Sequence, residues 1–192
     1  MIALIKYNGG NVSSVQNALT RLNIDSVITD DPELILKADK VIFPGVGEAS
    51  STMKLLKEKG LDVLIPSLKQ PVLGICLGMQ LMCGDNEEGN TRGMGIFDVD
   101  VKWFPPKDLV PHMGWNTISE LKSPLFSGIE DKSDVYFVHS YYCGLADATV
   151  AACDYILPFS ASLQKDNFFA VQFHPEKSGA TGSRILNNFI NL

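Results

Sequence analysis

The first eighty residues alternate between short apolar runs and stretches in which apolar residues recur at helical spacing. Strands are predicted at residues 2–6, 25–29, 40–44 and 71–75, and helices at 12–22, 32–37 and from Ala49 to Gly60. Asn11 is expected to cap the first of these helices after a turn at 8–11. Strands that alternate with helices in this way predict a parallel, doubly wound α/β sheet.

The second half of the chain has a different pattern. Residues 95–104 alternate between apolar and polar, which is typical of a strand with one face in water. Further strands are predicted at 133–138, 149–156 and 167–173, and one clear helix at 181–191. We therefore predict one α/β domain with an open mixed sheet, a mainly parallel core flanked by helices, and an antiparallel part.

Composition excludes several classes of function. The formal net charge of −6, with no Lys/Arg run, argues against a nucleic-acid partner. No apolar run approaches the ~18 residues that predict a membrane span, and the N-terminus lacks the basic region of a signal peptide. The four cysteines form no CxxC pair, so we expect no metal site, reduced thiols and a cytoplasmic protein.

Residues 74–78 have the form of a nucleophile elbow, with Cys76 between Gly74 and Gly78. In such an elbow a strand turns sharply into a helix, and the helix N-terminus favours a thiolate at the tip. The backbone N–H of Leu77 would then help to hold an oxyanion. The alternative is that Cys76 is a small buried hydrophobic residue, which is the role we assign to Cys83.

A cysteine nucleophile requires a base and a group that orients the base. His174 ends an apolar run, and Glu176 projects to the same side of an extended chain two residues later. A structural role for His174 remains open at this point. The sequence PGVG at 44–47 follows a predicted strand and is either a second source of oxyanion-binding N–H groups or a plain turn.

The motifs PGVG, GICLGMQ and FHPE, in this order across residues 2–190, resemble the class I (triad) glutamine amidotransferases. The resemblance implies a flavodoxin-like fold, one amidotransferase type 1 domain over 1–192, no cofactor, and L-glutamine as substrate. It implies that Cys76, His174 and Glu176 are catalytic and that Val46, Gly47 and Leu77 form the oxyanion site. It also implies that glutamine is bound by Gly45, Gln80, Glu88, His139, Ser140 and Tyr141. Without the resemblance, Gln80 would be interpreted as a solvated helix residue and Glu88 as a loop carboxylate.

The hexapeptide PHMGWN at 111–116 resembles the glutaminase subunits of imidazole glycerol phosphate synthases, in histidine biosynthesis. In that family, ammonia passes to a (β/α)₈-barrel cyclase in a heterodimer, which makes imidazole glycerol phosphate and the carboxamide ribotide AICAR. The resemblance places Met113, Trp115, Asn116, Tyr136 and Lys177 at the interface with the cyclase. It also suggests a PGVG loop that switches one peptide when the partner binds.

Three other interpretations remain open from the sequence. The chain could be a glutaminase of another synthase, in the anthranilate or pyridoxal phosphate pathway, although PHMGWN argues against it. It could be a non-catalytic regulatory protein on the same fold. It could also be a cysteine hydrolase or peptidase, but Gln80 and PHMGWN would then have no explanation.

Overall fold

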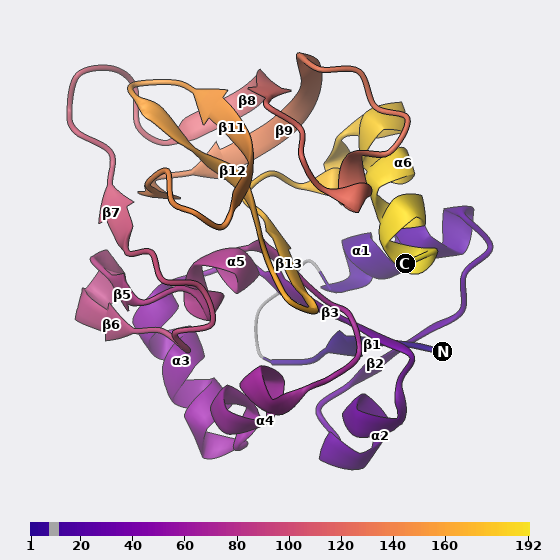
Figure 1. Ribbon diagram of the computed structural model, residues 1–192. Helices are drawn as coiled ribbons and strands as arrows, with labels where there is room; N and C mark the ends of the chain where they lie inside the picture. The colour runs from indigo at the N-terminus through magenta and orange to yellow at the C-terminus, as the bar shows by residue number, and fades with distance from the viewer. Residues whose placement is uncertain (8–11) are drawn as a thin grey trace.

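The computed structural model in Figure 1 describes residues 1–7 and 12–192. The predicted turn at 8–11 and its cap Asn11 lie outside the described residues. Within the described part of the chain, no helix is both long and apolar enough to span a membrane.

A nine-stranded sheet runs through the molecule in the order β2-β1-β3-β4-β13-β12-β11-β8-β9. The strands β1 to β4 and β13 are parallel to one another, whereas β13, β12, β11, β8 and β9 are antiparallel neighbours. The predicted mixed sheet is therefore confirmed, with β13 as the joint between its two parts. The strands are β1 Ile2–Ile5, β2 Ser26–Thr29, β3 Lys40–Gly45, β4 Val72–Cys76, β8 His112–Ser119, β9 Ser133–His139, β11 Thr149–Asp154, β12 Pro158–Lys165 and β13 Phe168–Val171.

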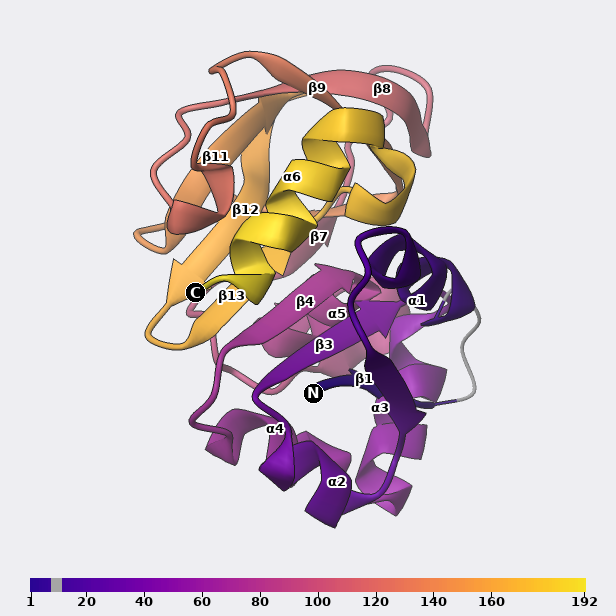
Figure 2. The ribbon, with the colours of Figure 1, turned by 90° about the vertical axis from the view of Figure 1, so that its right-hand side faces the viewer.

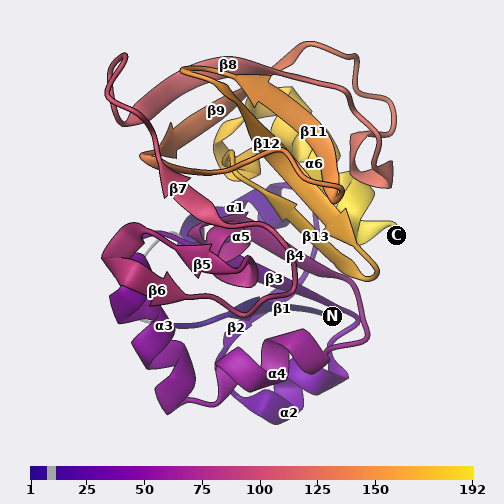
Figure 3. The ribbon, with the colours of Figure 1, turned by 60° about the vertical axis from the view of Figure 1, so that its left-hand side comes forward.

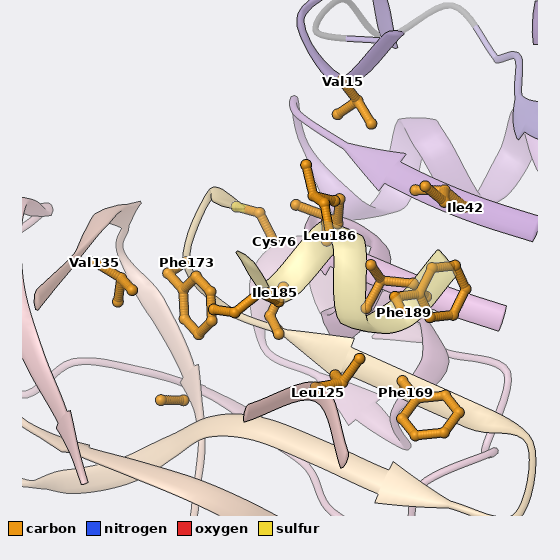
Figure 4. Close-up of a cluster of buried hydrophobic side chains, with 14 of the residues drawn as sticks. Val15, Ile42, Cys76, Leu125, Val135, Phe169, Phe173, Ile185, Leu186 and Phe189 are labelled. Atoms are coloured by element: carbon orange, nitrogen blue, oxygen red, sulfur yellow. The ribbon is translucent and has the colours of Figure 1, made fainter. Parts of the chain in front are cut away.

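Helices cover both faces of the parallel part. Along β1, Ile2 and Leu4 pack on one side with α1 and α6, whereas Ala3 and Ile5 pack on the other with α2 to α5. Figure 2 shows α1 and α6 together on the first side, and Figure 4 shows their side chains in the same cluster as Cys76. The helices are α1 Val12–Arg21, α2 Pro32–Lys37, α3 Ala49–Glu58, α4 Leu61–Ser67, α5 Leu77–Met82 and α6 Gly179–Ile190.

A second, four-stranded sheet has the order β10-β7-β5-β6, and Figure 3 labels its strands β7, β5 and β6. Its strands are β5 Asp85–Asn86, β6 Thr91–Arg92, β7 Val101–Trp103 and β10 Tyr141–Cys143. The prediction of one strand over 95–104 is wrong, because only β7 within it is a strand. The backbone N–H groups of 93–97 instead donate to carbonyls of residues 81–84 at the end of α5, and Gly95 has a positive φ of 67°.

Several elements were not predicted, among them β8 and the short strands β5, β6 and β10, and in two others the side chains obscure the pattern. The helix α4 contains Pro66 near its C-terminal end, a residue that normally argues against a helix. The strand β12 buries Ser160 and Ser162, whose hydroxyls donate to the carbonyls of Gly144 and Ala170. These polar residues in buried positions remove the apolar run that would have indicated a covered strand.

Candidate active site

The elbow predicted around Cys76 is present in the structure. Cys76 is the last residue of β4 and the residue before α5, with φ 54° and ψ −111°, a conformation that costs free energy for a residue other than glycine. At this turn β3 approaches α5 very closely, and glycines on both elements make the approach possible. A Cβ atom at Gly78 would collide with the carbonyl oxygen of Phe43, and one at Gly45 would collide with the backbone of Gly78.

The imidazole of His174 and the carboxylate of Glu176 form a buried pair directly after β13. Nδ1 of His174 lies 2.8 Å from Oε1 of Glu176, and both side chains are almost inaccessible to water. Pro175 between them turns the chain into a 3₁₀ helix, Pro175–Lys177. Because β13 and β4 are parallel neighbours with Val171 opposite Ile75, this pair lies at the same sheet edge as Cys76.

The protonation of His174 reflects its two neighbours. Burial by itself would lower the pKa of His174, but contacts with Cys76 and Glu176 outweigh burial and raise the pKa to about 10. The second ring nitrogen, Nε2, makes no hydrogen bond to any described residue. Nε2 is therefore the nitrogen left to exchange a proton with the thiol, through a contact that is looser than a hydrogen bond, as is common without substrate.

The sulfur of Cys76 has two further polar neighbours. The side-chain amide of Gln172 donates to the sulfur at 3.7 Å, and the carbonyl oxygen of Val138 lies 3.9 Å from it. Gln172 is fully buried, and the sequence prediction did not include it. Its position near the end of the predicted strand 167–173, two residues before His174, was the only signal that could have identified it.

A cavity of about 370 Å³ opens onto the thiol. This volume lies in the range of small-molecule sites. Seven predicted site residues besides Cys76 line the cavity, and Gly45, Val46, His174 and Glu176 do not. The lining residues are Gly47, Cys76, Leu77, Gln80, Glu88, Trp103, Pro111, Val138, His139, Ser140 and Tyr141.

Two predicted glutamine-binding residues are also used inside the protein. The amide nitrogen of Gln80 donates to the carbonyl of Tyr141 at 3.1 Å and to Oε1 of Gln172 at 3.0 Å. The carboxylate of Glu88 accepts the N–H of Ala49 at the start of α3, and burial raises the pKa of Glu88. Gln80 is therefore buried and not the solvated residue that the local pattern alone suggested, whereas Glu88 is a half-buried carboxylate in a 3₁₀ turn.

Tyr7, which the sequence prediction also missed, contacts the loop that contains PGVG and holds it in place. The Tyr7 hydroxyl donates to the carbonyl of Pro44 at 2.7 Å. Burial raises the pKa of Tyr7, while the backbone amide of Val46 acts in the opposite direction. At the end of the loop, Gly47 has a φ of 115° and faces the cavity.

Four of the five predicted interface residues lie together at the surface, and we name Met113, Trp115, Tyr136 and Lys177 the β8 patch. Met113 and Trp115 are 62% and 58% exposed on β8. Trp115 meets the ring of Tyr136 edge-on, and Nζ of Lys177 lies 5.8 Å from the centre of that ring. The fifth residue, Asn116, instead turns its amide inward, toward His112 and the carbonyl of Asp154.

No metal site accompanies the cavity in the described part of the chain, which holds no group of three or more His, Cys, Asp or Glu residues able to bind an ion. All four cysteines are free thiols. Cys83, directly after α5, and Cys143, on β10, lie with their sulfurs 3.5 Å apart, a contact that sequence spacing did not indicate.

Comparison with known proteins gives a consistent result over the whole chain. The family model described as "Glutamine amidotransferase class-I" matches residues 4–192. A protein of Bacteroides fragilis named "Imidazole glycerol phosphate synthase subunit HisH" is 61% identical over 100% of this chain and 99% of its own length. A protein of Vibrio parahaemolyticus with the same name is 43% identical over 100% of this chain and 98% of its own length.

Solved structures show the same fold at much lower identity. A structure described as a glutamine amidotransferase superimposes with a TM-score of 0.76 at 17% identity, covering 100% of this chain and 98% of that one. A second glutamine amidotransferase, from Thermotoga maritima, has a TM-score of 0.67 at 17% identity, covering 99% of this chain and 82% of that one.

Proposed function

The chain belongs to the class I glutamine amidotransferases, and on that basis we propose that it is the glutaminase subunit of an imidazole glycerol phosphate synthase. The observation that carries the proposal is the strained thiol of Cys76 beside the buried pair of His174 and Glu176, in a chain 61% identical to a protein with that name. The relatives' name favours this synthase over those of the anthranilate and pyridoxal phosphate pathways. The proposal treats residues 1–192 as one amidotransferase domain.

In the proposed reaction, the sulfur of Cys76 attacks the side-chain carboxamide carbon of L-glutamine. The raised pKa of His174 keeps a proton on its ring at neutral pH, and His174 passes this proton to the leaving nitrogen. Ammonia departs and a glutamyl thioester remains. Water then attacks the thioester, His174 accepts a proton from that water, and glutamate leaves as the sulfur is released. Glu176 holds the imidazole through Nδ1 in both steps.

Backbone N–H groups stabilise the negative oxygen that forms in each attack. The proposed donors are the amide of Leu77, at the first residue of α5, and an amide of Val46 or Gly47 in the opposite loop. Loss of one such donor typically slows a reaction by about 10²–10³-fold. Gln80, Glu88 and the segment 139–141 are proposed to hold the amino-acid end of glutamine. Gly45 allows the end of β3 to lie close to α5 beside this site.

The acceptor of the ammonia is proposed to be a cyclase with a (β/α)₈-barrel fold, which binds the nucleotide substrate and forms a heterodimer with this chain. The β8 patch supports this part of the proposal, because its exposed Trp115 and partly exposed Tyr136 are of the residue types favoured as anchors in protein interfaces. A cytoplasmic location, where the four free thiols stay reduced, completes the proposal.

The test is a glutaminase assay with and without the cyclase and its nucleotide, using the wild-type chain and Cys76→Ala. We expect the wild-type complex to form glutamate and to drive the synthase reaction with glutamine. The variant should lose the glutamine-dependent reaction by about 10⁴-fold or more and keep the reaction driven by added ammonia. A variant that retains glutamine-dependent synthesis would exclude the proposed role of Cys76.

A further inference from the structure

Two buried histidines connect the strand of the β8 patch with the substrate cavity: His139, which lines the cavity, and His112, which the proposed reaction does not use. Nδ1 of His112 on β8 lies 2.9 Å from Nε2 of His139 at the end of β9. Nδ1 of His139 lies 2.7 Å from the carbonyl oxygen of Tyr141, and Nε2 of His112 lies 3.1 Å from the amide nitrogen of Asn116. Both rings are almost inaccessible to water.

Only one assignment of protons satisfies all these contacts while both rings are neutral. The carbonyl of Tyr141 can only accept, so His139 carries its proton on Nδ1 and accepts at Nε2. His112 must then donate from Nδ1 and accept at Nε2 from the amide of Asn116. The second amide hydrogen of Asn116 donates to the carbonyl of Asp154, which fixes the orientation of this side chain.

The environment keeps the two rings neutral and in place. Burial lowers the pKa of His112 to about 4 and that of His139 to about 3, so neither ring is charged at neutral pH. His112 is stacked between Tyr155, at a centroid distance of 4.1 Å, and Phe137, at 4.7 Å. Packing therefore holds the plane of the His112 ring, and the acceptor carbonyls set the direction of the chain of hydrogen bonds.

The chain of hydrogen bonds continues to the thiol. The carbonyl of Tyr141 also accepts from the amide of Gln80, whose nitrogen bonds Oε1 of Gln172, and the amide of Gln172 donates to the sulfur of Cys76. His139, Tyr141 and Gln80 all line the cavity. A displacement of His139 would therefore move the cavity wall and the neighbours of the sulfur together.

We propose that His112 is a positioning residue for the reaction: it holds His139, and through His139 the Tyr141 carbonyl and the Gln80 amide, in the orientation that forms the cavity wall beside Cys76. The inference deepens the proposed glutaminase function and rests on it for the kinetic test alone. Its structural test does not depend on any activity.

The structural test measures the ring nitrogens by ¹⁵N NMR of the wild-type chain. The sequence has only three histidines, so comparison with a His112→Asn and a His174→Asn variant assigns each ring. We expect His112 and His139 to be neutral at pH 7 with the proton on Nδ1. A proton on Nε2 of neutral His112 or His139, or a charge on either of these two rings, would overturn the proposed order of donors.

The kinetic test compares two substitutions of His112 in the complex with the cyclase. His112→Phe keeps a ring between Phe137 and Tyr155 but removes the donor, whereas His112→Asn loses the ring but places an N–H near the position of Nδ1. We expect His112→Phe to raise the KM for glutamine about tenfold, with a smaller change in kcat, and His112→Asn to recover most of that loss.

The opposite order of the two variants would overturn the proposal, because a residue that only packs is replaced better by Phe than by Asn. Equal effects, or none, would overturn it as well. Thermal unfolding of both variants confirms that folded proteins are compared. If the wild-type complex hydrolyses no glutamine, the proposed function fails, and the ring tautomers still decide whether His112 orders the network.

Discussion

The two parts of the large sheet position the reacting groups in different ways. In the parallel part, the backbone positions Cys76, because a positive φ at the end of β4 and the close approach of β3 to α5 fix the turn that carries the thiol. In the antiparallel part and at β13, side-chain hydrogen bonds position His174, His139 and Gln172. The site therefore depends on backbone strain in the parallel part and on hydrogen bonds between buried polar side chains in the other part.

The largest effect is predicted for removal of the negative charge behind His174. In Glu176→Gln, the carboxylate that holds Nδ1 at 2.8 Å becomes a neutral amide, so the imidazolium is no longer favoured. We expect kcat for glutamine to fall by roughly 10²-fold or more with little change in KM, measured as glutamate released by the complex. A variant with wild-type kcat would show that the position of His174 does not depend on the carboxylate.

Acid should destabilise the antiparallel part through its two neutral histidines. Their pKa values are lowered from 6.5 to about 4 and about 3, so as the pH falls below 6.5 the unfolded chain binds protons that the folded chain does not. We expect the free energy of unfolding to fall by roughly 3 kcal/mol between pH 7 and pH 5, measured by urea titration, because each ring loses about 1.9 kcal/mol and the raised pKa of His174 opposes this by about 1 kcal/mol. His112→Phe removes one titrating group and should reduce the loss, and an unchanged stability in the wild-type chain would contradict the prediction.

A substitution at Gln172 tests the contact between the two parts. In Gln172→Leu, the sulfur of Cys76 loses its amide donor and Gln80 loses an acceptor, while the side chain keeps a similar volume. We expect kcat/KM for glutamine to fall about tenfold, because one buried hydrogen bond is lost at each of two groups. Gln164→Leu, on the neighbouring strand and only partly buried, is the matched control and should change neither rate nor stability noticeably.

The smallest predicted effect is in the loop of the parallel part. In Tyr7→Phe the ring keeps its edge contact with Phe43, but the hydroxyl that bonds the carbonyl of Pro44 is lost. We expect the free energy of unfolding to fall by about 1 kcal/mol, measured by denaturant titration. No loss of stability would mean that the loop is held by the backbone alone, like the elbow.

The same division explains how much could be predicted from the sequence. Periodicity predicted β1 to β4 and the helices α1, α2 and α3, because strands covered on both faces are apolar throughout. The elbow could be predicted because Gly74, Cys76 and Gly78 are local in sequence. The roles expected for the site residues stay predictions, although the structure brings most of them around one cavity.

What could not be predicted lies mainly where buried polar groups satisfy one another across strands. His112, Gln172 and Tyr7 were not indicated by any local pattern, and each has a hydrogen-bond partner 27 or more residues away along the chain. The segment 95–100 alternates like a strand, yet the N–H groups of residues 95–97 donate to carbonyls at the end of α5. Pairings of this kind depend on the finished fold, so single-sequence patterns do not contain them.

The glycines at the elbow have a consequence for protein engineering. Gly45 belongs to β3 and Gly78 to α5, and neither position has room for even a methyl group. A thiol of this kind could not be transplanted into another scaffold as a five-residue insert, because the neighbouring strand must be copied with it. Positions 45 and 78 should also be among the last in the chain to tolerate drift, whatever the enzyme is evolved to accept.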